Sequence, residues 1–209
     1  MPKGSDVIFN LHYTSYGEEG DDQSKIGLVF AARGWSPKWR YFVHNGPLAN
    51  NLAIPPHDAN AEVVGELTTQ VPMKLAYMQP HMHLRGKDFE MRLIFPSGDT
   101  KTVLKGKWNF DWHLGYDLDA PIDLPIGTRL VSICHFDNSV ANKNNPDPSK
   151  LVLWGDQNWD EMQNIFIGVL VDPKLDQRTF FKASGPSLLK RGTSGPTLSA
   201  LTLSAPGSF

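Results

Sequence analysis

Apolar and polar residues alternate over several short stretches of this chain, and long stretches with the spacing of an amphipathic helix are few. Side chains of a β-strand point to opposite faces in turn, so alternation predicts half-buried strands. The stretches that we predict as strands are 7–13, 26–30, 63–69, 73–78, 89–95, 101–104, 128–136 and 164–171. The chain also has 18 glycines and 16 prolines to form turns between strands. The pattern therefore predicts an all-β protein, either a sandwich or a barrel.

Three regions of the chain differ in pattern. In residues 1–33 two alternating stretches flank a polar loop, which predicts a hairpin with a long connection. Turn formers and aromatic residues then mark a domain boundary near Gly34, and the other predicted strands fall within 34–175. The region 176–209 has no acidic residue after Asp176 and becomes rich in Ser, Gly, Pro and Leu. We expect it to be a poorly ordered tail.

Composition and charge exclude several classes of partner. The 20 basic and 22 acidic residues give a net charge of -2, and neither sign forms a long run. A nucleic-acid surface needs a basic stripe, so we expect no nucleic-acid partner. No apolar stretch approaches the roughly 20 residues of a membrane-spanning helix, and the first residues do not form a signal peptide. The single cysteine, Cys134, permits no disulfide within the chain.

The stretch around His81 and His83 contains the strongest candidate chemistry. In a strand the two imidazoles would share one face while Met82 would point to the other, so the pair could hold a metal ion from a rigid base. A complete site needs a third ligand from elsewhere, either a carboxylate, another histidine or a methionine. The alternative is a pair of hydrogen-bonded histidines on a half-buried sheet, which needs no metal.

Cupins also place a His-x-His pair on a jelly roll, and we compared the chain with their motifs. Their first motif requires a glycine where this chain has Leu75, and an acidic residue that here could be Asp88. The turn Pro125-x-Gly127 fits their second motif, but this chain has Leu130 at the position where that motif requires a histidine. Two defining positions fail, so the cupin interpretation ranks second.

Four segments in order carry a more specific resemblance: "NLHYTSYGEEGDDQSKIGLVF", "IPP", "PHMHLRGKDF" and "DNSVANKNNPDP…WGDQNWDEM". They resemble the copper type II, ascorbate-dependent monooxygenases, the family of the peptidylglycine α-hydroxylating and dopamine β-monooxygenases. The sequence of these segments most resembles the bacterial members of the family, which often carry an upstream cytochrome c-like module. The resemblance covers Ser5 to about Pro173. It implies a jelly-roll β-sandwich over 34–175, preceded in 1–33 by the final hairpin of a truncated first copper domain.

The resemblance also implies the ligands of the copper that activates oxygen. In this family they are the His-x-His pair and the methionine of an Asp-Glu-Met motif, which here are His81, His83 and Met162. A soft thioether suits Cu(I), and imidazole serves both oxidation states. The alternative for Met162 is ordinary packing beside a strand.

A second, electron-supplying copper is bound by three histidines in this family. The last of them lies in a His-Tyr motif, which here is His12-Tyr13. The other two form an adjacent pair upstream, and this sequence contains no His-His pair. The resemblance therefore implies one complete copper site and one partial site, and we expect this chain alone to be inactive.

Substrate contacts differ from those of the peptide-hydroxylating members. Those members clamp a substrate carboxylate with an Arg, an Asn and a Tyr, where this chain has Gln79, Asn164 and Phe166. Without the cation the carboxylate has no bidentate partner, so we predict that the protein is not a peptidylglycine hydroxylase. Relatives commonly have Gln at the position of His113. We expect His113 and His135 to be structural residues or to support the ligands.

The expected activity is hydroxylation of a substrate C–H bond with O₂ and an external reductant. The implied partners are ascorbate or a cytochrome c-type electron donor and a small-molecule substrate that the sequence does not identify. The implied location is periplasmic or secreted. Two alternatives stay open: a copper-binding module without catalysis, and a cupin-type enzyme that would prefer iron or zinc.

Overall fold

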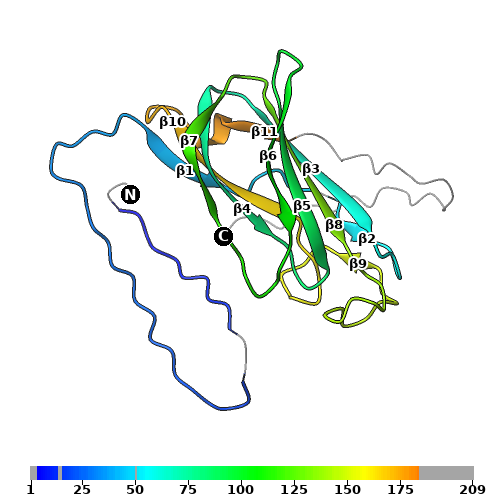
Figure 1. The fold of residues 1–209 in the computed structure, drawn as a ribbon. Coiled ribbons are helices and arrows are strands. Elements are labelled where there is room, and N and C mark those ends of the chain that lie inside the picture. Colours follow the sequence, from blue (N-terminus) through cyan, green and yellow to red (C-terminus); the bar gives the residue numbers. More distant parts are fainter. Residues whose placement is uncertain (1–3, 14–15, 50, 184–209) are drawn as a thin grey trace. The chain divides into compact units, whose positions relative to one another are not determined.

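The computed structural model describes residues 4–13, 16–49 and 51–183 of the chain (Figure 1). The chain forms two compact units, Met1–Ser36 and Pro37–Phe209, which divide close to the boundary predicted near Gly34. The described residues contain eleven strands and one short 3₁₀ helix, η1 (Gln177–Thr179), and no α-helix. No helix among them is long and apolar enough to cross a membrane.

The described residues of the first unit are extended and form no paired strand. The hydroxyl of Tyr13 donates to a carboxylate oxygen of Asp22 at 2.6 Å, but no backbone ladder joins the two stretches predicted as a hairpin. Their apolar side chains are exposed, among them Ile8, Val29 and Phe30. The structure therefore shows no paired strands among the described residues of this unit, where a hairpin was predicted.

The second unit contains a four-stranded sheet in the order β1-β10-β4-β7. Its strands are β1 (Arg40–His44), β10 (Asn164–Val171), β4 (Met73–His81) and β7 (Tyr116–Leu124). All neighbouring pairs are antiparallel. In the β10–β4 pair Asn164 lies opposite His81, so the strand that begins after Met162 meets the end of the strand that carries the histidine pair.

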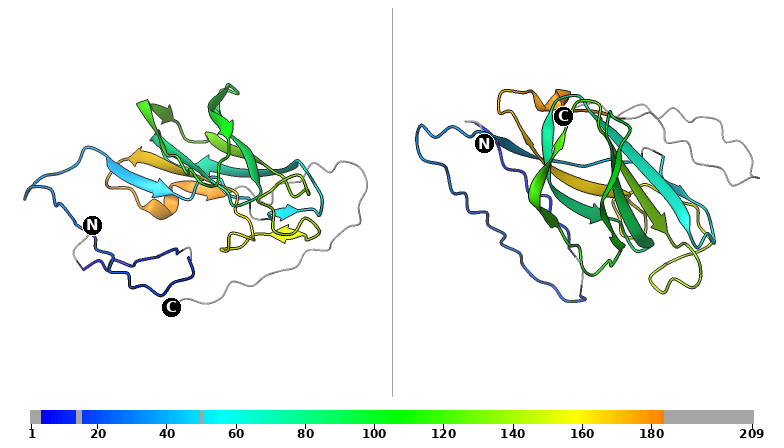
Figure 2. Two further views of the ribbon diagram at one scale, coloured as in Figure 1. Left: turned by 60° about the horizontal axis from the view of Figure 1, so that its bottom comes forward. Right: turned by 45° about the horizontal axis from the view of Figure 1, so that its top comes forward.

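A five-stranded antiparallel sheet has the order β11-β3-β8-β5-β6 (Figure 2). Its strands are β11 (Phe181–Ala183), β3 (Ala61–Thr69), β8 (Arg129–Phe136), β5 (Gly86–Ile94) and β6 (Thr100–Lys107). A small sheet pairs β2 (Ala53–Ile54) with β9 (Val152–Leu153). The two large sheets form a β-sandwich of jelly-roll type, which confirms the predicted fold class.

The core lies between the two large sheets. The inward residues of β10 alternate with outward ones, and Ile165, Ile167 and Val169 are fully buried against Leu75 of β4 and Leu93 of β5. Burying each such side chain contributes roughly 1.5–3 kcal/mol. Because this face of β10 and β4 is fixed by the core, their remaining side chains must point to the outer face of the four-stranded sheet.

The strand predictions for the sandwich are largely confirmed, and the prediction for β10 has the observed bounds. The sequence pattern missed β7, which contains Asp117, Asp119 and Pro121. This strand lies at the edge of its sheet, where proline and charged residues are tolerated because one side needs no ladder partner. The pattern also missed β1, the opposite edge strand, whose Tyr41 and Val43 are exposed.

The predicted tail is wrong over residues 176–183, which are folded. Asp176 caps η1 by accepting a hydrogen bond from the backbone N–H of Arg178, and β11 pairs with the edge of β3. Phe180 is fully buried and meets the ring of Phe42 edge-on at 5.3 Å. The pattern did not reveal this segment because one buried aromatic residue fixes it. The rest of the predicted tail, 184–209, lies outside the described residues.

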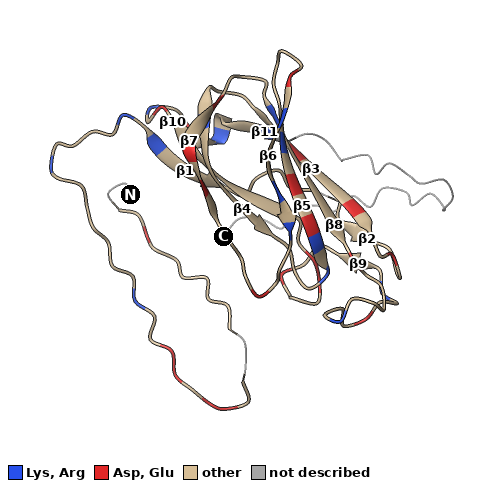
Figure 3. Ribbon diagram, viewed as in Figure 1, with Lys and Arg blue, Asp and Glu red and all other residues tan. Residues whose placement is uncertain are grey.

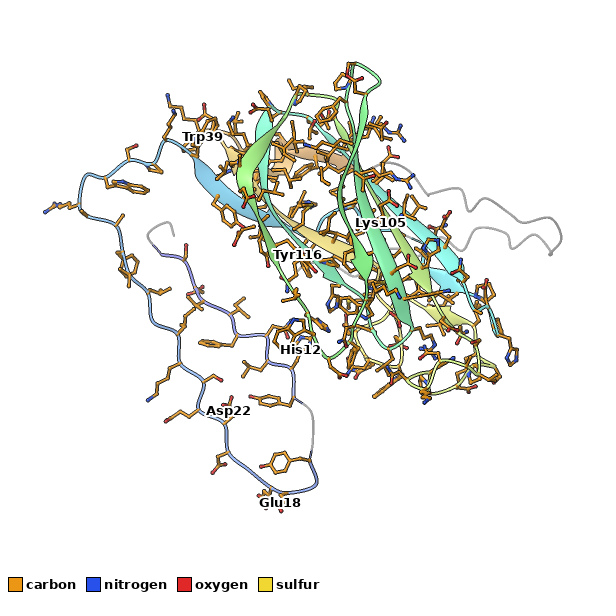
Figure 4. All side chains as sticks on the ribbon, in the orientation of Figure 1. His12, Glu18, Asp22, Trp39, Lys105 and Tyr116 are labelled. Atoms are coloured by element: carbon orange, nitrogen blue, oxygen red, sulfur yellow. The ribbon has the colours of Figure 1, made fainter. Side chains whose placement is uncertain are left out.

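The outer face of the five-stranded sheet carries charges of both signs (Figure 3). Glu90 of β5 bonds Arg92 at 2.5 Å and Lys105 of β6 at 3.1 Å, and Arg129 pairs with Glu66 at 2.5 Å. Lys105 is labelled on this side of the sandwich in Figure 4. These pairs identify the face as one in contact with water.

Candidate metal centre

The two histidines lie at the end of β4 on the outer face of the four-stranded sheet. His81 is the last residue of β4, Met82 is fully buried in the core, and His83 follows in the turn. The ring centroids of His81 and His83 are 5.3 Å apart, with planes at 89°. The predicted alternation is therefore confirmed: both imidazoles share one side, and Met82 takes the other.

His83 is only 4% exposed, and its ring Nδ1 has no hydrogen-bond partner among the described residues. Burial lowers the pKa of His83, although backbone hydrogen bonds to Asp160 and Gln157 oppose this change. A buried polar atom without a partner is costly, and structures rarely keep one without a reason. A neutral imidazole with a free ring nitrogen is the form that binds a metal ion.

Met162 lies two residues before β10 and is half-buried. Extending the β10–β4 register by two residues from the Asn164–His81 pair places Met162 across from His83. Gln163, which lies between Met162 and Asn164, is fully buried on the core side, where its amide donates to the hydroxyl of Ser132. If the alternation of β10 continued to Met162, its side chain would be on the side of the sheet that carries both rings.

The side chain of Glu161, the residue before Met162, connects the two segments. Its carboxylate accepts the backbone N–H of His83 at 2.8 Å and that of Arg85 at 2.6 Å. Glu161 is fully buried. Burial raises the pKa of its carboxyl to about 8, opposed by the backbone donors at Arg85 and His83 and by the Arg85 charge.

Arg85 belongs to a buried hydrogen-bond network that joins three of the four sequence segments quoted above, those that lie in the second unit. It is 1% exposed and donates to Asn138 Oδ1 at 2.9 Å and to the carbonyls of Trp159 at 2.8 Å and Asp147 at 3.5 Å. The Asn138 amide in turn donates to the carbonyl of Pro55 at 2.8 Å. The segments "IPP", "PHMHLRGKDF" and "DNSVANKNNPDP…WGDQNWDEM" therefore meet beside the candidate site.

Aromatic rings surround His81. Its ring centroid lies 5.5 Å from that of His113, 5.9 Å from Phe166 and 6.4 Å from Trp108. The Trp108 indole N–H donates to the carbonyl of His83 at 3.0 Å, and its ring lies so close to Gly86 that an added Cβ would be 2.4 Å away. The rings form an apolar wall on one side of the candidate metal centre.

Residues on the same face complete the surroundings. Asn164 is 4% exposed, and its Oδ1 has no partner in the part of the chain that the structure describes. Gln79 accepts a hydrogen bond from the Tyr77 hydroxyl at 2.9 Å. The predicted positions Gln79, Asn164 and Phe166 are therefore all on the face that carries His81.

One histidine singled out in the sequence, His135, is not at this centre. His135 belongs to β8 of the other sheet, where its Nδ1 lies 2.6 Å from Asp88 and its Nε2 lies 3.6 Å from Glu62. His12, labelled in Figure 4, belongs to the first unit and is exposed. His113, by contrast, was expected to be a supporting residue and does lie beside His81.

The described residues contain no group of three His, Cys, Asp or Glu side chains that could hold a metal ion. A site at His81 and His83 would therefore need a third ligand of another kind, and the one implied by the resemblance is the thioether of Met162. Sequence reasoning named candidate ligands, whose role stays a prediction, and missed the contacts of Glu161 and Arg85. Both residues lie in segments that contain several other charged residues, so no signal in the sequence singled them out.

No protein-family model and no curated protein matches the chain. Among solved structures, this chain is similar to a chain in the structure of the infectious bursal disease virus Gt strain. The sequence identity is 9% and the TM-score is 0.31, and the match covers 74% of this chain and 38% of that one. The crystal structure of the VP2 subviral particle of the same virus has 11% sequence identity to this chain and a TM-score of 0.32, and the match covers 70% of this chain and 37% of that one. A family 35 carbohydrate-binding module from an environmental isolate has 9% sequence identity and a TM-score of 0.29, and the match covers 61% of this chain and 91% of that one. Similarities this distant carry no argument about function.

Proposed function

We propose that the sandwich binds one copper ion through His81, His83 and Met162 and serves as the oxygen-activating domain of a copper monooxygenase. The observation that carries the proposal is the buried Nδ1 of His83, which has no partner among the described residues although the His81 ring lies 5.3 Å away. The sheet register supports it: continued two residues past its last pair, Asn164–His81, it would put Met162 opposite His83.

The donor set fits copper better than zinc. Two imidazoles and a thioether suit a metal that alternates between Cu(I) and Cu(II), whereas zinc sites recruit Cys, His or carboxylate ligands. Bound copper would supply one-electron chemistry with O₂, in which two electrons and two protons accompany transfer of one oxygen atom to a C–H bond and release of the other as water. The chain's own contribution is a ligand set held on a rigid sheet end.

The surroundings of His81 support an uncharged substrate group near the metal. Phe166, Trp108 and His113 present ring faces and edges, which exclude water and pack against apolar groups. Gln79 replaces the cation that would bind a carboxylate and already accepts a hydrogen bond from Tyr77. We propose a small-molecule substrate and, as before, no peptidylglycine hydroxylation.

Electrons would come from ascorbate or a cytochrome c-type donor through a second copper. His12 of the first unit would provide one ligand of that site, and the two others are absent from this sequence. The chain by itself should therefore bind copper without turning over substrate. A periplasmic or secreted location belongs to the same proposal.

The incomplete second site favours one alternative, a copper-binding module without catalysis. It shares the ligands of the main proposal and differs only in activity. The cupin-type alternative needs a cluster of His and carboxylate ligands, and the described part of the chain contains no such group of three. It therefore has less support.

Copper titration tests the ligand set. The wild-type chain is expected to bind one Cu(I) per molecule, and Met162→Ala is expected to weaken binding about 100-fold, because losing a ligand costs at least as much as losing a residue that orients one. Met91→Leu, in the core of β5, is the matched control and should leave the affinity unchanged.

Equal Cu(I) affinity in the wild type and Met162→Ala would contradict the proposal. Oxygen consumption then separates enzyme from binding module: when a second copper site is supplied by a fused donor domain, ascorbate-dependent O₂ uptake is expected. Copper binding without such uptake would favour the module.

A further inference from the structure

We propose that the buried carboxylate of Glu161, supported by Arg85, is a positioning residue that holds the Met162 sulfur within reach of the metal. The inference rests on the proposed copper site and adds a residue to it. We name the arrangement the carboxylate bridge: the Glu161 side chain with the backbone N–H groups of His83 and Arg85 that it accepts.

The carboxylate bridge supplies hydrogen-bond acceptors at a point where the backbone pairing of β4 with β10 has ended. Pairing between β4 and β10 stops at His81 and Asn164, so the N–H groups of His83 and Arg85 lie past the end of the sheet. One oxygen of Glu161 accepts each of them, at 2.8 and 2.6 Å. A single side chain therefore fixes the distance between the backbone of one histidine ligand and the residue preceding the methionine ligand.

The backbone of the bridge residue is fixed separately. Its N–H donates to the carbonyl of Leu153 and its carbonyl accepts from Gly155, both at 3.2 Å, and it forms a parallel bridge with Trp154. Gly155 is required there because an added Cβ would lie 2.2 Å from the Asp160 carboxylate. Glu161 is therefore anchored through both its main chain and its side chain.

Arg85 strengthens the same connection from the other side. Its backbone N–H reaches Glu161, while its guanidinium donates to the carbonyl of Trp159, two residues earlier in the same segment. Both side chains are almost completely buried. Burying polar side chains like these is costly, and Glu161 meets Arg85 through the Arg85 backbone N–H, so their presence beside Met162 indicates a requirement for geometry.

The test separates positioning from general stability by a double-mutant cycle. Glu161→Gln retains the size of the side chain but has only one oxygen, so it can accept only one of the two N–H groups with its former geometry. We expect it to weaken Cu(I) binding about 10- to 100-fold and to remove the sulfur scatterer from the copper X-ray absorption spectrum, with the nitrogen scatterers retained. In a Met162→Ala background the same substitution should cost no further affinity.

The matched control is Asp156→Asn, an exposed carboxylate on the same loop, which should change neither the spectrum nor the affinity. A Glu161→Gln variant that keeps the sulfur scatterer and the affinity would overturn the inference, as would losses that simply add in the double mutant. Absence of sulfur from the wild-type spectrum would overturn the proposed ligand set itself, and the inference with it.

Hydrogen exchange provides a measurement that needs no change at Glu161. If the bridge positions Met162, Cu(I) should slow exchange of the His83 and Arg85 amides in the wild type and have no such effect in Met162→Ala. Equal slowing in both proteins would mean that the bridge responds to the histidines alone, and would overturn the inference.

Discussion

Two regions of the sandwich use the same kinds of side chain in opposite ways. On the outer face of the five-stranded sheet, His135 lies between the carboxylates of Asp88 and Glu62, each of them partly exposed to water. At the end of β4, His83 and Arg85 are 4% and 1% exposed, and one ring nitrogen of His83 has no partner among the described residues.

The difference shows what identifies a candidate site. Histidines and carboxylates on a wet sheet face pair with their neighbours and contribute little, since exposed ion pairs are worth about 0–1 kcal/mol. Burial of the same groups is costly, and it occurs where the segments that contain Pro55, Arg85 and Asn138 meet. The cost is therefore concentrated at the residues proposed to hold and position copper.

The largest expected effect comes from removing the buried cation. Arg85→Ala would remove a buried guanidinium that donates to Asn138 Oδ1 and to the carbonyl of Trp159, and should lower the free energy of unfolding by about 2–5 kcal/mol. Arg129→Ala on the wet face removes a pair with Glu66 and should cost at most about 1 kcal/mol. Denaturant unfolding of both variants measures the comparison. Similar losses would show that burial does not distinguish the two regions.

The two histidines should differ next in metal affinity. His83→Ala removes a proposed ligand and should weaken Cu(I) binding about 100-fold, because ligand loss exceeds the 10- to 100-fold effect typical of supporting residues. His135→Ala should leave Cu(I) affinity unchanged, because its ring belongs to the other sheet. Competition titration with a Cu(I) chelator measures both. A loss in His135→Ala would remove the distinction between the two regions.

Glu90 of β5, a largely buried carboxyl whose partners Arg92 and Lys105 are exposed to water, predicts a pH effect. The hydrogen bond from Arg92, with smaller contributions from Lys105 and Thr102, lowers the pKa of Glu90 from 4.5 to about 2. A carboxyl with a lowered folded-state pKa stabilises the fold above its unfolded value, and this contribution is lost as the pH falls from about 4.5 through 2. Glu90→Gln should therefore reduce stability by about 1–3 kcal/mol at pH 7. The difference from wild type should vanish near pH 2 in pH-dependent unfolding, and a difference constant with pH would exclude this origin.

Much of the sandwich follows from local pattern, since the central strands alternate clearly and the core fixes their faces. The edge strands β1 and β7 do not, because an edge tolerates Pro121, exposed aromatics and acidic residues that disguise the alternation. Residues 176–183 were missed for a related reason, since they are held by one buried ring, Phe180, and a short edge pairing. Such contacts depend on distant residues and leave no period in the sequence.

For the candidate site, the pattern predicted which side of the sheet His81 and His83 share, and the structure confirms it. The ligand role of Met162 stays a prediction. The sequence could not reveal that Glu161 bonds the backbone of His83 and Arg85, because these partners are 78 and 76 residues away and become neighbours only when β10 pairs with β4.

The smallest expected effect concerns His113, which lies beside the candidate centre and tests whether nearness alone makes a ligand. Its ring packs 4.6 Å from Trp108 and 5.5 Å from His81, and it is exposed. Together with His81 and His83 it forms no group able to hold a metal within the described residues. His113→Ala should therefore change Cu(I) affinity by less than about threefold, well below the loss expected for supporting residues. A 100-fold loss would instead make it a third nitrogen ligand, and Met162→Ala would then be the variant with little effect.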